Sequence, residues 1–208
     1  KIKRYGTLYK IGATGFAKEI AKVAENYTPH LKQIELSGFE KREISSYYSD
    51  ELYSSKDVID LLVKGDLNIQ YITQDGYCVH RKKTIEEVME QLKSKQVVIL
   101  QSKLGNGKSV FLECLANELL AEYNVYFLKD IDNYVDDLQL IQSGVDRCNV
   151  IMVDDYGYYI QFIKDLGKNF PENLRLVLTC RTAININLYY DLTEKYGYLE
   201  ENLYLCDI

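Results

Sequence analysis

The stretch VVILQSKLGNGKSV, residues 97–110, decides how the whole chain is interpreted. Its apolar start predicts a buried strand over Val97–Gln101, and the wide apolar stripe that follows predicts a helix over residues 108–122. Between them, Gly105 and Gly107 permit a turn whose successive backbone N–H groups point inward. A strand, a glycine-containing turn and a helix N-terminus in this order predict a phosphate-binding loop.

Two side chains of this loop have chemistry suited to a nucleotide. Lys108 is expected to reach the β- and γ-phosphates as a point charge, and the Ser109 hydroxyl to bind Mg²⁺. The usual pattern, G-x-x-x-x-G-K-[ST], has glycine where this chain has Ser102. A chance occurrence of the short motif is the alternative. The other residues of this stretch expected to contact the nucleotide are Ser102, Leu104, Gly105, Asn106, Gly107 and Val110.

A second buried strand, Asn149–Val153, ends in two carboxylates. Ligands of open α/β sheets bind at the carboxyl ends of strands, so both acids should face the phosphate loop. Asp154 is then expected to hold Mg²⁺, and Asp155 to act with Lys108 in catalysis by orienting or deprotonating the attacking water. The alternative is that the two acids open a surface turn.

The strand expected at 174–179 ends in Thr179, followed two residues later by Arg181. If this strand lies between the loop strand and the acidic strand, both side chains are within reach of the γ-phosphate and can sense its presence. An ordinary strand end with a surface arginine is the alternative.

Strands and helices alternate regularly from residue 78 onward. A T-x-x-E capping box at Thr84 and Glu87 predicts a helix to residue 94. Five apolar strands joined by helices predict an α/β fold, a three-layer core with a five-stranded parallel sheet. The remaining strands are expected at 124–128 and 202–206, and the remaining helices at 132–143, 158–168 and 188–196.

Two acids after one strand and Thr-x-Arg after the next resemble the STAND class of P-loop NTPases, which includes the NACHT and NB-ARC ATPases and bacterial antiphage relatives. The resemblance covers residues 77–208. It implies the strand order 5-1-4-3-2 and a role for Val79 and Arg81 in lining an adenine pocket, although His80 replaces the usual glycine between them.

The resemblance also implies an activity. In a STAND protein, nucleotide exchange or the binding of ATP, rather than GTP, drives self-association, and Mg²⁺-dependent ATP hydrolysis is expected to be slow. An effector domain would lie elsewhere in a longer chain, as would the helical lid and winged helix. A motor or loader ATPase of the AAA type is an alternative that Asp155 disfavours, because motors usually have Glu there. A nucleotide-binding scaffold is another, kept open by Ser102.

Residues 1–76 give mixed signals and are interpreted as a small α/β linker or partial domain. The pattern predicts strands at 8–11 and 31–36, helices at 14–27 and 56–64, a loop over 41–55 and an extended segment over 68–72. Ser55 would cap the second helix and Gly65 would end it. Gly12 and Gly15 weakly suggest a dinucleotide fold, and Tyr9–Gly12 faintly resembles sirtuin-type domains.

The composition narrows the range of partners. A formal net charge of −6 argues against a broad electrostatic contact with nucleic acid or an anionic membrane. No apolar run approaches the ~18 residues that a membrane-spanning helix needs. The five cysteines are far apart and form no CxxC pair, so the spacing predicts neither a zinc site nor a disulfide framework, and a reduced cytoplasmic protein is expected.

Overall fold

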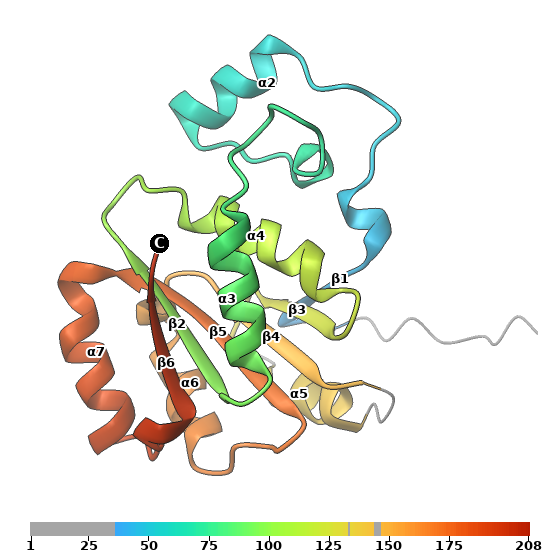
Figure 1. The fold of residues 1–208 in the computed structure, drawn as a ribbon. Helices are drawn as coiled ribbons and strands as arrows, with labels where there is room; N and C mark the ends of the chain where they lie inside the picture. Colours follow the sequence, from blue (N-terminus) through green and yellow to red (C-terminus); the bar gives the residue numbers. More distant parts are fainter. Residues whose placement is uncertain (1–35, 133, 144–146) are drawn as a thin grey trace, which may run out of the picture. The chain divides into compact units, whose positions relative to one another are not determined.

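The computed structural model describes residues 36–132, 134–143 and 147–208, which contain one six-stranded sheet (Figure 1). The strand order is β1-β3-β4-β5-β2-β6. Neighbouring strands from β3 to β6 run parallel, and β1 pairs antiparallel with β3 at one edge. The bounds are β1 Phe39–Arg42, β2 Val97–Ser102, β3 Asn124–Leu128, β4 Asn149–Val153, β5 Leu174–Arg181 and β6 Leu203–Asp207.

The prediction of a purely parallel sheet of five strands is wrong in strand count, and the order of the whole sheet changes with it. The five parallel strands occur where apolar runs predicted them, and β1 adds a sixth. Its sequence, Phe-Glu-Lys-Arg, gives no apolar run, and part of it was expected to be loop. The strand forms because β3 offers it an open edge.

Helices cover both faces of the sheet, as the three-layer prediction requires. The parallel strands bury side chains on both sides, so Val98 and Leu100 face one core while Val97 and Ile99 face the other. The first core contains α3 (Lys82–Leu92) and α4 (Lys108–Leu119). The second contains side chains of α5 (Tyr134–Ser143), α6 (Ile160–Gly167) and α7 (Thr182–Glu194).

Several predicted element bounds need correction. Helix α3 begins at Lys82 after Arg81, so Thr84 and Glu87 lie inside the helix and form no capping box. Helix α7 begins at Thr182, directly after β5, and not at residue 188. In the segment between α2 (Ser55–Ile59) and α3, residues 69–71 form a 3-10 turn instead of the predicted extended structure.

The segment before α3 also differs from its prediction in detail. The cap of α2 is Ser54, one residue earlier than predicted, and Asp57 completes its capping box. The chain continues through a π-helical turn at Asp60–Lys64 and ends in left-handed Gly65, as predicted for a C-terminal glycine. A 3-10 turn at Ile44–Tyr47 lies in the stretch expected to be loop.

The elements predicted before residue 36, together with Gly12 and Gly15, lie outside the described residues. The domain boundary at residue 76 stays a prediction. Residues Leu36–Ile208 form one compact unit, in which the side chains of Tyr47, Tyr71 and Ile72 share the core on α4. No helix among the described residues is long and apolar enough to cross a membrane.

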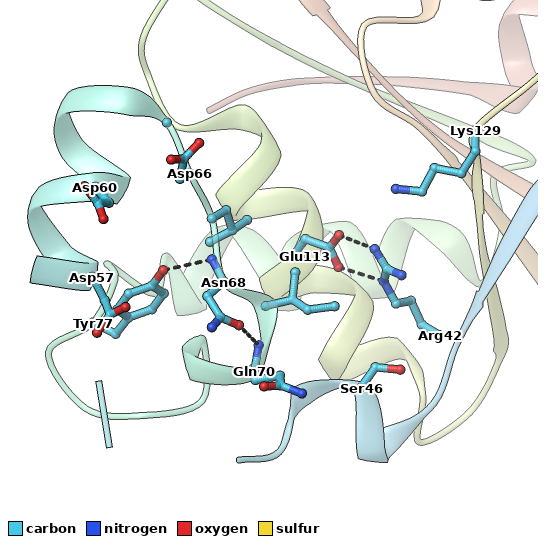
Figure 2. Close-up of a pocket in the computed structure, with 13 residues that line it drawn as sticks. Arg42, Ser46, Asp57, Asp60, Asp66, Asn68, Gln70, Tyr77, Glu113 and Lys129 are labelled. Carbon is cyan, nitrogen blue, oxygen red and sulfur yellow. Dashed lines mark hydrogen bonds and ion pairs between the residues drawn. The ribbon is translucent and has the colours of Figure 1, made fainter. Parts of the chain in front are cut away.

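A buried ion pair attaches this early segment to α4. Arg42 is 4% exposed and Glu113 is 7% exposed, and Arg42 Nη2 lies 2.7 Å from Glu113 Oε1 (Figure 2). The Tyr47 hydroxyl donates to Glu113 Oε2 at 2.7 Å. Burial raises the pKa of Tyr47, and the Glu113 carboxylate raises it further. Burial acts to lower the pKa of Arg42, but the bonds and charge of Glu113 outweigh it and raise that pKa.

We expect Arg42→Met to destabilise the protein by about 3 kcal/mol, because it leaves the Glu113 carboxylate buried without its cation. Urea unfolding should show this as a lower midpoint with an unchanged slope. Lys129→Met is the matched control, since Lys129 pairs with exposed Glu40 and its loss should cost less than about 1 kcal/mol. Adding Glu113→Leu to Arg42→Met should recover most of the lost stability. Equal midpoints for Arg42→Met and Lys129→Met would contradict the assignment.

Candidate nucleotide-binding site

The predicted phosphate loop borders a pocket of about 390 Å³ at the carboxyl ends of the strands. Gly105 and Gly107 have φ of 77° and 74°, in the left-handed region where a side chain is strained. Gly107 is the N-cap of α4, so the first helical N–H groups and the positive end of the helix dipole lie beside the pocket. The predicted site residues that line the pocket are Leu104, Gly105, Gly107, Lys108, Ser109, Val110, Asp154, Asp155 and Arg181.

A chain of hydrogen bonds joins the phosphate loop to the acidic strand end. The Ser109 hydroxyl donates to Asp154 Oδ2 at 2.6 Å. The Thr179 hydroxyl donates to Asp154 Oδ1 at 2.5 Å and accepts from the Asp155 backbone N–H at 2.8 Å. Both oxygens of Asp154 are therefore oriented by hydroxyl groups from two other elements.

The strand order explains why these residues meet. Strand β5 lies between β2 and β4, which is the condition set for Thr179 and Arg181 to approach the loop. In register, Leu100 of β2 is opposite Thr179, and Ser102 is opposite Arg181. Ser109 and Asp154, which are 45 residues apart in the chain, thus come into hydrogen-bond contact.

Asp155 has an unusual backbone conformation. Its φ of 51° and ψ of 63° make it the one non-glycine residue with positive φ in the described part of the chain. Aspartate tolerates this region better than most residues, and such conformations concentrate at functional sites. The bond to Thr179 holds the turn, and Asp155 lines the pocket.

Five predicted site residues do not line the pocket, namely Ser102, Thr179, Val79, Asn106 and Arg81. Ser102 is buried at the end of β2, and its hydroxyl bonds the Lys103 carbonyl. Thr179 is fully buried, and its hydroxyl donates to the Asp154 carboxylate. Val79 is 81% exposed. Asn106 instead bonds Arg81 and Ile208, which helps to fix the shape of the loop.

Arg81 and Asn106 bond to each other across the loop. Arg81 Nη2 donates to the Asn106 carbonyl at 2.8 Å, and Asn106 Nδ2 donates to the Ile208 carbonyl at 2.6 Å. Among the described residues, Arg81 Nη1 is the one buried side-chain nitrogen or oxygen without a hydrogen-bond partner. Arg81 thus supports the loop through Nη2, while its Nη1 has no partner in the described part of the chain.

Sequence reasoning missed the residues that complete the pocket wall. They belong to the π-helical turn and the segment after it, and they are Leu61, Leu62, Gly65 and Leu67. In the structure Leu62 is 78% exposed, which is unusual for a large apolar side chain. The sequence itself shows only leucines near the end of a short predicted helix, and that pattern does not indicate a pocket.

The donor set fits Mg²⁺. Ser109 Oγ and Asp154 Oδ2 lie 2.6 Å apart, and both residues line the pocket. A hydroxyl and a carboxylate are hard oxygen ligands. Mg²⁺ prefers such oxygens and keeps several waters when it binds.

A second, larger pocket of about 910 Å³ lies beside the Arg42–Glu113 pair (Figure 2). Figure 2 shows Asn68, whose backbone N–H donates to the Tyr77 hydroxyl at 3.0 Å. Gly65 and Leu67 line both pockets, so the segment after the π-helical turn forms the wall between them.

The fold and this site define a P-loop NTPase. The chain matches the family described as Novel STAND NTPase 3 over residues 80–208 and belongs to that family. The STAND resemblance noted in the sequence is therefore confirmed. Nucleotide binding and NTP hydrolysis are the activities of such a family. No curated protein matches this chain.

Two solved structures are similar to parts of the chain. PCH-2 of C. elegans is 11% identical, with a TM-score of 0.40 over 62% of this chain and 42% of its own. Trip13 of Rhizobiales is 13% identical, with a TM-score of 0.33 over 74% of this chain and 58% of its own. The chain thus spans about half the length of these proteins.

Proposed function

We propose that this chain binds ATP in the 390 Å³ pocket and hydrolyses it slowly, as the nucleotide-gated switch of a longer protein. The observation that carries the proposal is the hydrogen-bond chain from Ser109 through Asp154 and Thr179 to Asp155. This chain of bonds supports the proposal because the glycine-containing loop and the two acids line the same pocket.

Each side chain has a distinct part in binding. The inward N–H groups around Gly105 and Gly107 and the ammonium of Lys108 bind the phosphate oxygens. Ser109 and Asp154 hold Mg²⁺, which neutralises charge on the phosphates when bound. The Nη1 of Arg81, unpartnered within the residues that the structure describes, supports its assignment to the nucleotide, together with Val79 two residues earlier in the chain. ATP rather than GTP is proposed from the STAND resemblance.

Asp155 is proposed to orient and deprotonate the attacking water. Its carboxylate lines the pocket, and its backbone is fixed by Thr179, so Thr179 is a positioning residue for both acids. Arg181 is exposed at the pocket wall, where its guanidinium can bind the γ-phosphate.

The position of Arg181 also suggests how the switch works. Arg181 ends β5 and is the N-cap of α7, so a bond to the γ-phosphate would act on the start of that helix. We propose that this change favours self-association and activates an effector domain outside this sequence. A bacterial antiviral role and a cytoplasmic location are proposed from the STAND resemblance and the reduced cysteines.

Steady-state ATPase assays with sedimentation in ATP and in ADP test the switch. We expect unstimulated turnover well below ~1 s⁻¹, the lower end of the usual range for enzymes, and a larger assembly with a non-hydrolysable ATP analogue than with ADP. Turnover above that level would indicate a motor ATPase instead. The same sedimentation profile in both nucleotides would contradict nucleotide-gated assembly, and absent hydrolysis with retained binding would indicate a scaffold.

A further inference from the structure

Three soft ligand groups meet between the segment before α3 and the helix of the phosphate loop. Cys78, His80 and Cys114 each offer one ligand atom, and these atoms lie within 4.8 Å of one another. Cys114 is buried on α4, whereas Cys78 and His80 are half-buried. The two cysteines are 36 residues apart in the chain, so the sequence shows no sign of this cluster and predicts no zinc site.

We propose that Cys78, His80 and Cys114 bind a thiophilic divalent metal ion of the zinc class. Two cysteines and one histidine form a donor set that zinc prefers, and three protein ligands leave one tetrahedral position for water. This site is independent of the proposed Mg²⁺ site, which contains only oxygen ligands.

The distances already match a metal site. The two sulfurs are 3.9 Å apart, and a ring nitrogen of His80 lies within 4.8 Å of both. Tetrahedral zinc with Zn–S bonds of about 2.3 Å holds two sulfurs roughly 3.8 Å apart. A disulfide would need the sulfurs to approach by roughly 2 Å more, so the metal requires less movement.

The histidine has the support that metal-binding histidines usually have. Its Nε2 lies 2.6 Å from the Ile72 carbonyl, which can only accept. Nε2 therefore carries the hydrogen, and Nδ1 keeps the free lone pair. Metal-bound histidines commonly donate their second ring N–H to a carbonyl in this way, which fixes the ring and its tautomer.

The position of the cluster gives the metal a structural consequence. Cys78 and His80 precede Arg81, whose guanidinium bonds the Asn106 carbonyl in the phosphate loop. Cys114 belongs to α4, which begins at the same loop. A bound ion would fasten the segment of Arg81 to the helix of Lys108, so metal should stabilise the folded protein without any nucleotide.

The test is a titration of the reduced 208-residue protein with Co²⁺ and then Zn²⁺, without nucleotide. We expect one equivalent of Co²⁺ to give a thiolate-to-metal charge-transfer band and tetrahedral visible bands, which Zn²⁺ abolishes. Zn²⁺ should also raise the thermal midpoint. Cys78→Ser and His80→Ala should each weaken binding by at least the ~10–100-fold typical of altered metal sites.

Two controls separate this site from other metal sites. Cys148→Ser should leave the spectrum unchanged, because Cys148 is a half-buried thiol that bonds only the Asn173 carbonyl. Asp154→Asn should also leave it unchanged. Cys114 is buried, so Cys78→Ser and His80→Ala, at half-buried positions, carry the test without depending on its replacement. Absence of a thiolate band, an unchanged spectrum in Cys78→Ser, or loss of the band in Cys148→Ser would overturn the proposal.

Discussion

Lys108→Ala is expected to weaken ATP binding by at least ~100-fold, about 3 kcal/mol, and to abolish hydrolysis. Lys108 is the half-buried ammonium that lines the phosphate pocket, beside the loop N–H groups. Removing it takes away a positive charge where several phosphate charges must be accommodated, and no backbone group replaces it. Isothermal titration with a non-hydrolysable ATP analogue and Mg²⁺ measures the loss.

Lys103→Ala is the matched control for this substitution. Lys103 is an exposed lysine of the same loop, five residues earlier, and it does not line the pocket. It should keep ATP affinity within about threefold of the wild type, since an exposed charge is screened by solvent. If Lys108→Ala folds normally and binds ATP as tightly as Lys103→Ala, the loop is not the phosphate site.

Asp155→Asn is expected to keep ATP binding and to lower the hydrolysis rate by ~10²–10⁴-fold. Asparagine keeps the shape of the side chain and tolerates the left-handed conformation at φ 51°, so the backbone bond to Thr179 should survive. What is lost is the carboxylate that can accept a proton from water. Single-turnover hydrolysis and the binding titration measure the two effects separately.

Asp154→Asn provides the contrast. Asp154 is bonded to Ser109 and Thr179 and is assigned to Mg²⁺, so its replacement should weaken Mg²⁺-dependent ATP binding as well as hydrolysis. The two acids then differ in which step they affect. An Asp155→Asn variant that hydrolyses ATP at the wild-type rate would remove Asp155 from the mechanism, and one that no longer binds ATP would move it to the binding residues.

Much of the parallel core could be predicted from the sequence because its signals are local. Strands buried on both faces require continuous apolar runs, and Val97–Gln101 and Asn149–Val153 are such runs. Left-handed Gly105 and Gly107 are where a turn between strand and helix needs them. Helix ends were predicted less well, since the start of α7 depends on where β5 ends and not on its own cap.

The sequence by itself determined the parallel strands, the phosphate loop and the two acids, because each is specified by neighbouring residues. Only the tertiary structure decided that β1 pairs with β3, that Thr179 is buried against Asp154, and that Cys78 approaches Cys114. These contacts join segments far apart in the chain. They form because packing of the helices on the sheet brings those segments together, and that packing follows from the whole core and not from any one stretch of residues.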